Sequence, residues 1–480
     1  MTIEIVKGKN YPYCFINGLE KVNPNIRSSI EKILYSSMSY FVKNFQRTYK
    51  YKRGEWDGRD VLMYKSRSGS IYFPVGLINE AVSIITAHGI NVTIKSAPKK
   101  KKINTKFVWK SDKKLYDFQE KALNAFISEG DKYSINVNSG IICMPTGSGK
   151  TIVLCKIIEY YSQPTLIVVH TKELLHQWVN VIGEVFGIEA SVIGDGTVKY
   201  NSDIAVATMQ TLNSLIKKRK IDLSGFSTLV IDEAHRAPAE TIYSISMRCD
   251  ANVRVGATAT PHREDGADLK MYAALGPIVI NINAIDLIKS GVIAKPEFRF
   301  LRPPIVPIRG REWSDVRDIG IVANDERNDM IVEEVKKLVK DGHSVYISVD
   351  IIDHGEILIE RLKSVGLRAE WLHGRHSSKL RKRVIEEFRR GELSIIVSTL
   401  LKEGVDIPEI TAYVNAGGGK SEVSTIQKVG RALRKSEKKG LSAVIVDFID
   451  GGHVFLTRHW DARWFAYREY YGHYCPFPGD

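Results

Sequence analysis

The chain has 480 residues, of which 44% are hydrophobic and 26% are charged, with a net charge of +14. This length predicts two to four domains, and the composition excludes a wholly disordered protein. The charge is uneven, because residues 1–110 carry 20 Lys and Arg against 7 Asp and Glu, and the rest carries 49 against 48. A basic first part is typical of contact with a polyanion or an acidic membrane surface, although a basic surface without a partner also explains it.

Cysteine usage and hydropathy narrow the class of protein further. The five cysteines form no CxxC pair and lie in no His-rich segment, so we expect neither a structural metal site nor a disulfide framework. The first ten residues lack an apolar signal core, and no segment approaches the roughly 18 uncharged apolar residues of a membrane span. We expect an intracellular protein without a membrane segment.

The first part of the chain has the pattern of a small basic α+β domain over residues 1–97. Short β-like runs occupy 71–75 and 92–95, and a helix is predicted near 25–45. Residues 98–111 contain a run of lysines that repel one another, so this segment is predicted to be an extended linker.

After the linker, short apolar runs alternate with helical segments, which predicts an α/β fold with two parallel sheets in tandem. The first series of runs lies at 141–144, 165–169, 203–208, 228–232 and 253–258, and the second at 344–349, 367–372, 394–399, 411–416 and 442–448. Helices are predicted at 324–340 and 377–390. The predicted boundaries are 112–285 for the first domain, 286–322 for an interdomain segment, 323–450 for the second domain and 451–480 for an aromatic tail.

The first apolar run ends in MPTGSGKT, residues 144–151, directly before a helical pattern. Gly147 and Gly149 let backbone N–H groups turn towards phosphate oxygens, Lys150 adds a charge near the β- and γ-phosphates, and Thr151 offers a hydroxyl to Mg²⁺. Met144 replaces the first glycine of the phosphate-loop pattern, and an ordinary glycine turn is the alternative.

The fourth run ends in Asp232, Glu233, Ala234 and His235. A carboxylate at the carboxyl end of a parallel strand lies at the same sheet edge as the phosphate loop. Asp232 is therefore a candidate to hold Mg²⁺, and Glu233 a candidate to orient and deprotonate the attacking water. A solvated acidic turn after a buried strand is the alternative.

These motifs, in this order over residues 112–447, resemble those of the superfamily-two helicases of the DEAH/DExH kind. The resemblance implies two RecA-like domains that use ATP and Mg²⁺. It implies that Gln119 reads the adenine edge, although Tyr116 stands where many relatives have arginine. The remaining implied roles are phosphate binding by Thr146 and Ser148, and coupling of hydrolysis to strand contact by His235, Thr258 and Thr260.

The second half of the chain carries the motif with which the second domain contributes to the ATP site in this family. It contains Gln427, Arg431 and Arg434 in the spacing QxxGRxxR. Two arginines three residues apart share one face of a helix, so both can point at a γ-phosphate. We assign Arg434 as the arginine finger and Arg431 as its companion; a basic helix face in water is the alternative. Gly404 and Asp406 match the preceding motif, in which Asp406 contacts ribose.

Polar residues that follow the apolar runs are candidates for nucleic-acid contact. Hydroxyls, amides and helix N-termini bind phosphates without reading bases, which suits a motor that moves on any sequence. Each could equally be a helix cap. The candidates are Thr171, Lys172, Thr208, Gln210, His373 and Thr399.

Two closer resemblances concern shorter segments of the chain. Residues 256–266 resemble the XPB branch, in which Arg263, Glu264 and Asp265 would form a short element that helps to separate strands. Residues 51–59 resemble the N-terminal module of phage UvsW-type helicases. There Trp56 could stack on a base and Arg53 or Arg59 could clamp phosphates, or Trp56 could belong to the core beside an Asp57–Gly58 hairpin turn.

The combined interpretation is an ATP-dependent DNA helicase or translocase that remodels branched DNA by branch migration at forks and four-way junctions, in recombination, repair or replication. An RNA or R-loop helicase and an ATP-gated clamp without unwinding are the alternatives. The resemblance implies a cytoplasmic, nucleoid-associated protein, such as one in a phage-infected bacterium. The aromatic tail either stacks on DNA or packs back onto the second domain.

Overall fold

The computed structural model describes residues 2–8, 12–95, 106–131, 137–199, 202–235, 239–260, 268–400, 409–434 and 442–479. The chain forms two compact units, one of residues Met1–Met144 with Gly149–Ile282 and one of Pro145–Ser148 with Asn283–Asp480. Within the described ranges, no helix combines the length and the apolar character that crossing a bilayer requires.

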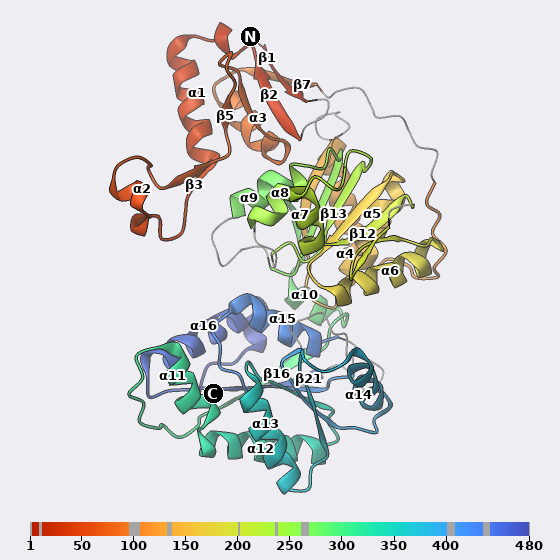
Figure 1. Cartoon of the computed structure of the whole chain (residues 1–480), viewed down its shortest axis with the longest axis vertical. Helices are drawn as coiled ribbons and strands as arrows, with labels where there is room; N and C mark the ends of the chain where they lie inside the picture. Colours follow the sequence, from red (N-terminus) through yellow and green to blue (C-terminus); the bar gives the residue numbers. More distant parts are fainter. Residues whose placement is uncertain are drawn as a thin grey trace. The chain divides into compact units, whose positions relative to one another are not determined.

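The N-terminal part of the first unit is a five-stranded sheet in the order β5-β6-β2-β1-β7, covered by two helices (Figure 1). Its apolar side chains alternate along β1, so one face is buried. The strands are β1 (Thr2–Lys7), β2 (Tyr13–Asn17), β5 (Tyr64–Lys65), β6 (Ile71–Pro74) and β7 (Asn91–Lys95), and the helices are α1 (Pro24–Ser37) and α3 (Ile78–Ala87). The runs predicted at 71–75 and 92–95 are confirmed.

The helix predicted near 25–45 is shorter than expected. Pro24 begins α1 with Asn23 as its cap, and the helix ends at Ser37. The chain then forms β3 (Ser39–Phe41), which pairs antiparallel with β4 (Arg59–Val61). Backbone hydrogen bonds between β3 and β4 therefore replace the last turns of the predicted helix. Between the two strands lies the short helix α2 (Tyr49–Lys52).

The core of this N-terminal sheet continues into the rest of the first unit. Its buried cluster includes Val137 and Ala273, which lie far along the chain. The Lys7 ammonium is buried and donates to Asp250 Oδ1 at 3.1 Å and to Asn252 Oδ1 at 3.2 Å. Apolar packing and a buried ion pair thus join the two parts of the unit.

The remainder of the first unit is an eight-stranded sheet in the order β11-β10-β12-β9-β13-β14-β8-β15, parallel except for the β10–β11 pair. The strands are β8 (Asn138–Cys143), β9 (Thr165–Val169), β10 (Ser191–Gly194), β11 (Thr197–Val198), β12 (Ile204–Thr208), β13 (Thr228–Ile231), β14 (Val253–Thr258) and β15 (Ile278–Asn281). The helices are α4 (Asp117–Asp131), α5 (Lys150–Tyr161), α6 (Lys172–Phe186), α7 (Met209–Lys217), α8 (Ala239–Ser246) and α9 (Asp268–Leu275). All five predicted runs are strands, and every residue of these five strands is buried, as expected for strands covered on both faces.

The second unit contains a six-stranded, all-parallel sheet in the order β16-β21-β20-β17-β19-β18. Its strands are β16 (Lys295–Leu301), β17 (Val345–Ser348), β18 (Ala369–Leu372), β19 (Ile395–Ser398), β20 (Ala412–Asn415) and β21 (Ser442–Phe448). Its helices are α10 (Ala284–Lys289), α11 (Trp313–Arg317), α12 (Asp325–Lys340), α13 (Ile352–Ser364), α14 (Ser378–Arg390), α15 (Glu422–Ala432) and α16 (Val454–Tyr471). The second series of runs and the two predicted helices are confirmed.

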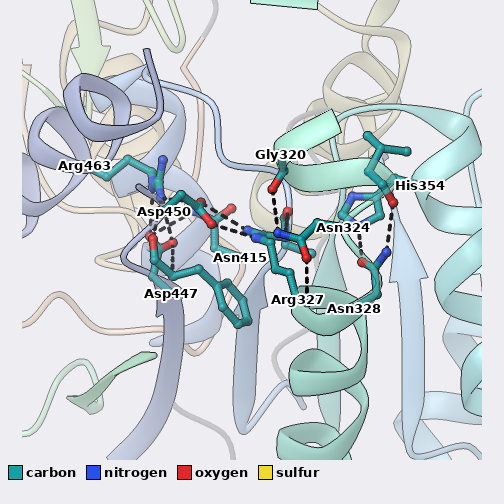
Figure 2. A network of polar contacts seen from close by, with 12 residues as sticks. Gly320, Asn324, Arg327, Asn328, His354, Asn415, Asp447, Asp450 and Arg463 are labelled. Carbon is teal, nitrogen blue, oxygen red and sulfur yellow. Dashed lines mark hydrogen bonds and ion pairs between the residues drawn. The ribbon is translucent and has the colours of Figure 1, made fainter. Parts of the chain in front are cut away.

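The aromatic tail packs onto the second unit, which confirms the second of its two interpretations. Arg463 and Tyr467 on α16 both reach the buried Asp447 carboxylate at the end of β21. Figure 2 shows that this contact belongs to a larger network, in which Asp450 also accepts from Arg327 on α12. The tail helix is therefore part of the core of this unit.

Candidate nucleotide and nucleic-acid site

The phosphate loop joins β8 to α5. Gly149 occupies the N-cap position of α5 with a φ of 78°, and Gly147 has a φ of 85°, a conformation that favours glycine. Lys150 is the first residue of the helix, and its buried Nζ donates to Met144 O at 3.3 Å. The N-cap residue is a glycine, which has no side chain to cap the helix, so backbone N–H groups of the first turn can serve an anion.

Gln119 lies beside this helix start. It is buried on α4, and its Oε1 accepts a hydrogen bond from Tyr116 N at 3.0 Å. A methyl group added at Gly149 would collide with the Gln119 amide nitrogen, which shows how closely the two approach. Tyr116 is exposed and stacks on Phe118, with 5.7 Å between ring centroids. The structure therefore brings the predicted base-reading glutamine to the phosphate loop.

Asp232 follows β13 and is held by two neutral N–H donors. Its Oδ2 accepts from Trp178 Nε1 at 2.9 Å, and its Oδ1 accepts from Glu233 N at 2.9 Å. Burial and the neighbouring Glu233 carboxylate raise the pKa of Asp232, while the Trp178 hydrogen bond and the Lys150 charge oppose this. Glu233 has a φ of 51°, a strained conformation of the kind found at functional sites.

Trp178 is a site residue that the sequence did not reveal. It lies on α6, is 1% exposed, and reaches Asp232 from 54 positions away. Its only sequence signal is its place on the apolar face of an amphipathic helix, where a tryptophan usually serves the core. The hydrogen bond depends on the neighbouring positions of α6 and β13, which only the fold shows.

His235 connects the DEAH segment to the next strand. Its Nδ1 lies 2.6 Å from Thr258 Oγ1 at the end of β14 and 3.5 Å from Glu233 Oε2. Thr258 Oγ1 donates to Thr260 O at 2.8 Å, so His235 Nδ1 is assigned as the donor to the hydroxyl. The three residues predicted to couple hydrolysis to strand contact are thus adjacent.

These residues fit a nucleotide with Mg²⁺. Thr151 is the second residue of α5, whose N-cap is the glycine at the end of the phosphate loop. Asp232 supplies a carboxylate two strands away in the same sheet. Hydroxyl and carboxylate oxygens are the ligands that Mg²⁺ takes together with nucleotide phosphates.

The strand-end residues of the first unit have mixed roles. The Thr171 Oγ1 accepts a hydrogen bond from Leu174 N at 3.2 Å, so Thr171 caps α6. This hydroxyl therefore has the capping role that was the alternative to nucleic-acid contact. Lys172 pairs with Asp195 at 2.6 Å, and Gln210 Nε2 donates to His170 O at 3.1 Å. Thr208 precedes α7 and donates to Thr211. Thr171 and Lys172 follow β9, Thr208 is the last residue of β12 and Gln210 follows it, and these two strands are neighbours in the sheet.

In the second unit, His373 follows β18 and Thr399 follows the adjacent β19. The ring centroids of His373 and His376 lie 3.7 Å apart. Burial and the charges of His376 and Arg375 lower the pKa of His373. A neutral imidazole at this position can contact a nucleic acid by hydrogen bonding and stacking.

Gln427 and Arg431 share one face of α15, being four residues apart. The prediction that Arg434 continues this face is wrong. The helix ends at Ala432, Arg434 forms an antiparallel bridge with Ile293, and Ala294 N donates to Leu433 O at 2.8 Å. Pairing with the chain before β16 therefore draws Arg434 off the helix.

In the N-terminal module, Trp56 is half-buried and its Nε1 donates to Arg59 O at 2.6 Å. Arg59 donates to Ser39 Oγ, whereas Arg53 is exposed. Gly58 has a φ of 88° in the turn before β4. The predicted contributions of Arg263, Glu264, Asp265, Gly404 and Asp406, and most of the linker, lie outside the described residues.

Comparison with known proteins gives two family matches and several named relatives. Residues 112–263 match the family "Type III restriction enzyme, res subunit", and residues 326–436 match "Helicase conserved C-terminal domain". The chain is 28% identical to the DNA 3'-5' translocase XPB2 of Sulfurisphaera tokodaii, covering 69% of this chain and 81% of that one. It is 23% identical to the ATP-dependent DNA helicase uvsW of Enterobacteria phage T4, covering 84% of each.

The fold is also found in solved structures. Dbp5 of S. cerevisiae, bound to RNA and ADP BeF3, matches with a TM-score of 0.53 and 18% identity over 75% of this chain and 88% of that one. The two family matches span more than half of the chain and contain the phosphate loop, the DEAH segment and the α15 motif. The chain therefore belongs to the superfamily-two helicases, and it is an ATP-hydrolysing enzyme of that family.

Proposed function

We propose that this protein is an ATP-dependent DNA helicase or translocase that remodels branched DNA, such as forks and four-way junctions. One observation carries the ATPase part of the proposal. Strands β13, β14 and β8 are adjacent, and at their carboxyl ends lie Asp232, Thr258 and the loop to Lys150. The proposed metal ligand, coupling hydroxyl and phosphate-binding lysine therefore share one sheet edge.

In the proposed mechanism, the glycine loop from Thr146 to Gly149 and Lys150 hold the phosphates, and Gln119 reads the adenine. Thr151 and Asp232 hold Mg²⁺, which when bound neutralises charge on the β- and γ-phosphates. Glu233 accepts the proton of the attacking water. Gln427, Arg431 and Arg434 of the second unit, with Asp406 at the ribose, complete the site in this proposal.

His235 and Thr258 give this site a physical route to the strand-binding edge. A hydrogen bond between them joins the segment that holds Glu233 to the end of β14. A change in the position of Glu233 on hydrolysis would alter that bond and, through Thr258, the orientation of Thr260. We propose this as the coupling between ATP turnover and movement on DNA.

One observation supports DNA as the polymer, because the relatives are named as a DNA translocase and a DNA helicase. Two more support a nucleic acid of either kind: the N-terminal part of this chain carries its charge excess, and the strand-end residues can bind phosphates. The preference for branched substrates rests on the resemblance to uvsW. A cytoplasmic, nucleoid-associated location is part of the same proposal.

The ATPase assignment is tested by replacing Glu233 with Gln and Lys150 with Ala. Turnover should fall by about 100-fold or more, because loss of a general base costs that much, while DNA binding persists. Glu189→Gln is the matched control, since it removes an exposed carboxylate of the same unit. Normal turnover in Glu233→Gln would refute the assignment.

The substrate is tested by comparing unwinding of a four-way DNA junction, a plain DNA fork and an RNA duplex. We expect the junction and the fork to be unwound with ATP and the RNA duplex to resist. Preferred unwinding of RNA, or of an RNA–DNA hybrid added as a fourth arm, would favour an RNA or R-loop helicase. ATP-dependent binding without strand separation or movement would favour a clamp.

A further inference from the structure

The loop between β3 and β4 has an unusual composition. We call residues 41–59 the tip. It contains six basic residues against two acidic ones, and five aromatic residues. The basic residues are Lys43, Arg47, Lys50, Lys52, Arg53 and Arg59, and the aromatic residues are Phe41, Phe45, Tyr49, Tyr51 and Trp56.

The tip has almost no core of its own. Gly58 is its only buried residue, and the buried cluster of the N-terminal sheet passes from Met38 to Leu62 without a member in between. Figure 1 shows the segment around α2 extending from the rest of this sheet and its helices. Tyr49 is 66% exposed and Phe41 is 53% exposed. Large aromatic side chains gathered at an exposed site are typical of an interaction surface.

Two of the aromatic residues, Phe45 and Trp56, contact other residues of the tip and stabilise its fold. Phe45 stacks on Phe41 with 5.1 Å between ring centroids, meets Tyr51 edge-on at 4.7 Å, and lies close against Gly58. Trp56 is tied to Arg59 O. Phe45 and Trp56 therefore hold the fold of the loop, and Tyr49 is the most exposed ring that remains.

Each of the two most exposed rings has a guanidinium over it. Arg53 lies 4.3 Å from the centroid of Tyr49, and Arg59 lies 4.4 Å from that of Phe41. Lys50 and Lys52 flank Tyr49 and Tyr51 in sequence and are exposed. Stacking rings interleaved with cations are the features with which proteins bind unpaired bases and their phosphates.

The base of the tip is firmly anchored within the first unit. Asp60 on β4 accepts from Lys270 on α9 at 2.7 Å, and Lys270 also pairs with Glu240 on α8. Tyr40 donates to the same Asp60 carboxylate at 3.1 Å. The base of the tip is thus attached to α9 and, through Lys270, to α8, the helix that follows the DEAH segment in the chain.

We propose that the tip binds an unpaired base at the branch point of DNA, with Tyr49 as the stacking platform and Arg47, Lys50 and Lys52 as phosphate contacts. This inference rests on the proposed function and specifies where the branch is recognised. It replaces Trp56, the residue chosen from sequence, with Tyr49. An anionic membrane is the competing partner for a basic aromatic loop. DNA is favoured because a planar guanidinium already stacks on each of the two rings, Tyr49 and Phe41, and a planar base can stack on such a ring in the same way.

The test uses the full chain and a DNA fork with the fluorescent base 2-aminopurine at the branch point. Stacking on Tyr49 should quench the probe when the protein binds. Tyr49→Ala should abolish the added quenching and weaken fork binding by about tenfold, as expected for loss of one stacked base. Tyr49→Trp should preserve both. Tyr160→Ala is the matched control, because Tyr160 is 57% exposed in the same unit.

A second variant tests the charges. Lys50→Gln with Lys52→Gln should lower the salt dependence of fork binding by roughly one to two units of slope, about 0.7 to 0.9 for each phosphate contact. Both sets of substitutions are at exposed positions, so thermal unfolding should match that of the unmodified protein.

The outcomes separate this inference from the proposed function. If single-stranded DNA stimulates ATP turnover in all variants but Tyr49→Ala binds the fork normally, the tip assignment is wrong. If the unmodified protein neither binds DNA nor responds to it, the proposed function is wrong. Equal quenching on an RNA fork would overturn the assignment to DNA. Binding to phosphatidylserine vesicles that Tyr49→Ala abolishes, with fork binding intact, would assign the tip to membranes.

Discussion

The two parallel sheets place carboxylates at the ends of their strands but stabilise them in different ways. In the first unit, Asp232 is held by the indole N–H of Trp178 and a backbone N–H. In the second unit, Asp447 accepts two hydrogen bonds from the Arg463 guanidinium, and Asp450 accepts two from Arg327. The first arrangement uses neutral donors, and the second uses full opposite charges.

This difference suggests what each sheet edge does. A carboxylate held by neutral donors keeps its negative charge available for a cation, and its pKa is raised by burial. A carboxylate bound by a buried guanidinium has its charge already compensated, so it serves structure. The same architecture thus holds a carboxylate by neutral donors in one unit and by a buried ion-pair network in the other.

The largest expected effect comes from breaking the closed network. Arg463→Met should reduce the free energy of unfolding by about 3–5 kcal/mol, because it removes one partner of a buried ion pair and leaves Asp447 without its guanidinium. Denaturant unfolding of the full chain measures this. Arg458→Met on the same helix is the control, since Arg458 is exposed and should change stability by less than about 0.5 kcal/mol.

The comparison would fail if the two arginine variants behaved alike. Adding Asp447→Asn to Arg463→Met should recover part of the lost stability, because the double variant no longer contains the uncompensated carboxylate. A double variant less stable than the sum of its single variants would show that charge pairing is not what joins α16 to the sheet.

An intermediate effect is expected from the pH dependence of the second unit. Burial and the Arg327 charge lower the pKa of His354 to about 3, while Asp350 opposes this, and His354 Nε2 bonds to Asn328 Oδ1. The unfolded chain therefore binds the extra proton between pH 6.5 and 3, so stability is complete above this range and decreases as the pH falls. From pH 7 to pH 5 this group alone should cost about 2 kcal/mol.

His354→Gln keeps a donor for Asn328 but cannot titrate. Denaturant unfolding at pH 7 and pH 5 should show a smaller loss in this variant than in the unmodified protein. His473→Gln, at an exposed site in the same unit, should leave the loss unchanged. Equal losses in all three proteins would show that folding does not lower the pKa of His354.

The smallest effect concerns the neutral donor of the first unit. Trp178→Phe keeps an aromatic ring but removes the indole N–H, which is one of the two donors to Asp232. We expect kcat for ATP to fall roughly tenfold, which corresponds to about 1.4 kcal/mol, with DNA affinity unchanged. Trp109→Phe is the control, since the Trp109 ring contacts the Lys156 ammonium in the same unit. An equal fall in both variants would indicate a packing effect.

Sequence patterns predicted the regular parts of this structure well. β-branched apolar runs such as 165–169 and 253–258 form the strands with matching ends, because runs of this kind are stable only when covered on both faces. The phosphate loop and the DEAH segment were also recognisable, since glycines and carboxylates at strand ends leave a local signature.

Features that depend on distant pairing were missed. The helix predicted near 25–45 stops where β3 pairs with β4, and Arg434 leaves its helix to pair with Ile293. The hydrogen bond from Trp178 to Asp232 depends on a tertiary contact. For the predicted helix and for Arg434, local helical propensity was overridden by pairing with a distant segment.

The ion pair between Lys7 and Asp250 has a consequence for the synthesis of the protein. The two residues are 243 positions apart, and the core around β1 also includes Ala273. At roughly 5–20 residues per second, the ribosome would deliver Asp250 on the order of 10–50 seconds after Lys7. The N-terminal strands are therefore synthesised well before the residues that complete their core. We expect chaperones that shield nascent chains to associate with this protein until its first unit is complete.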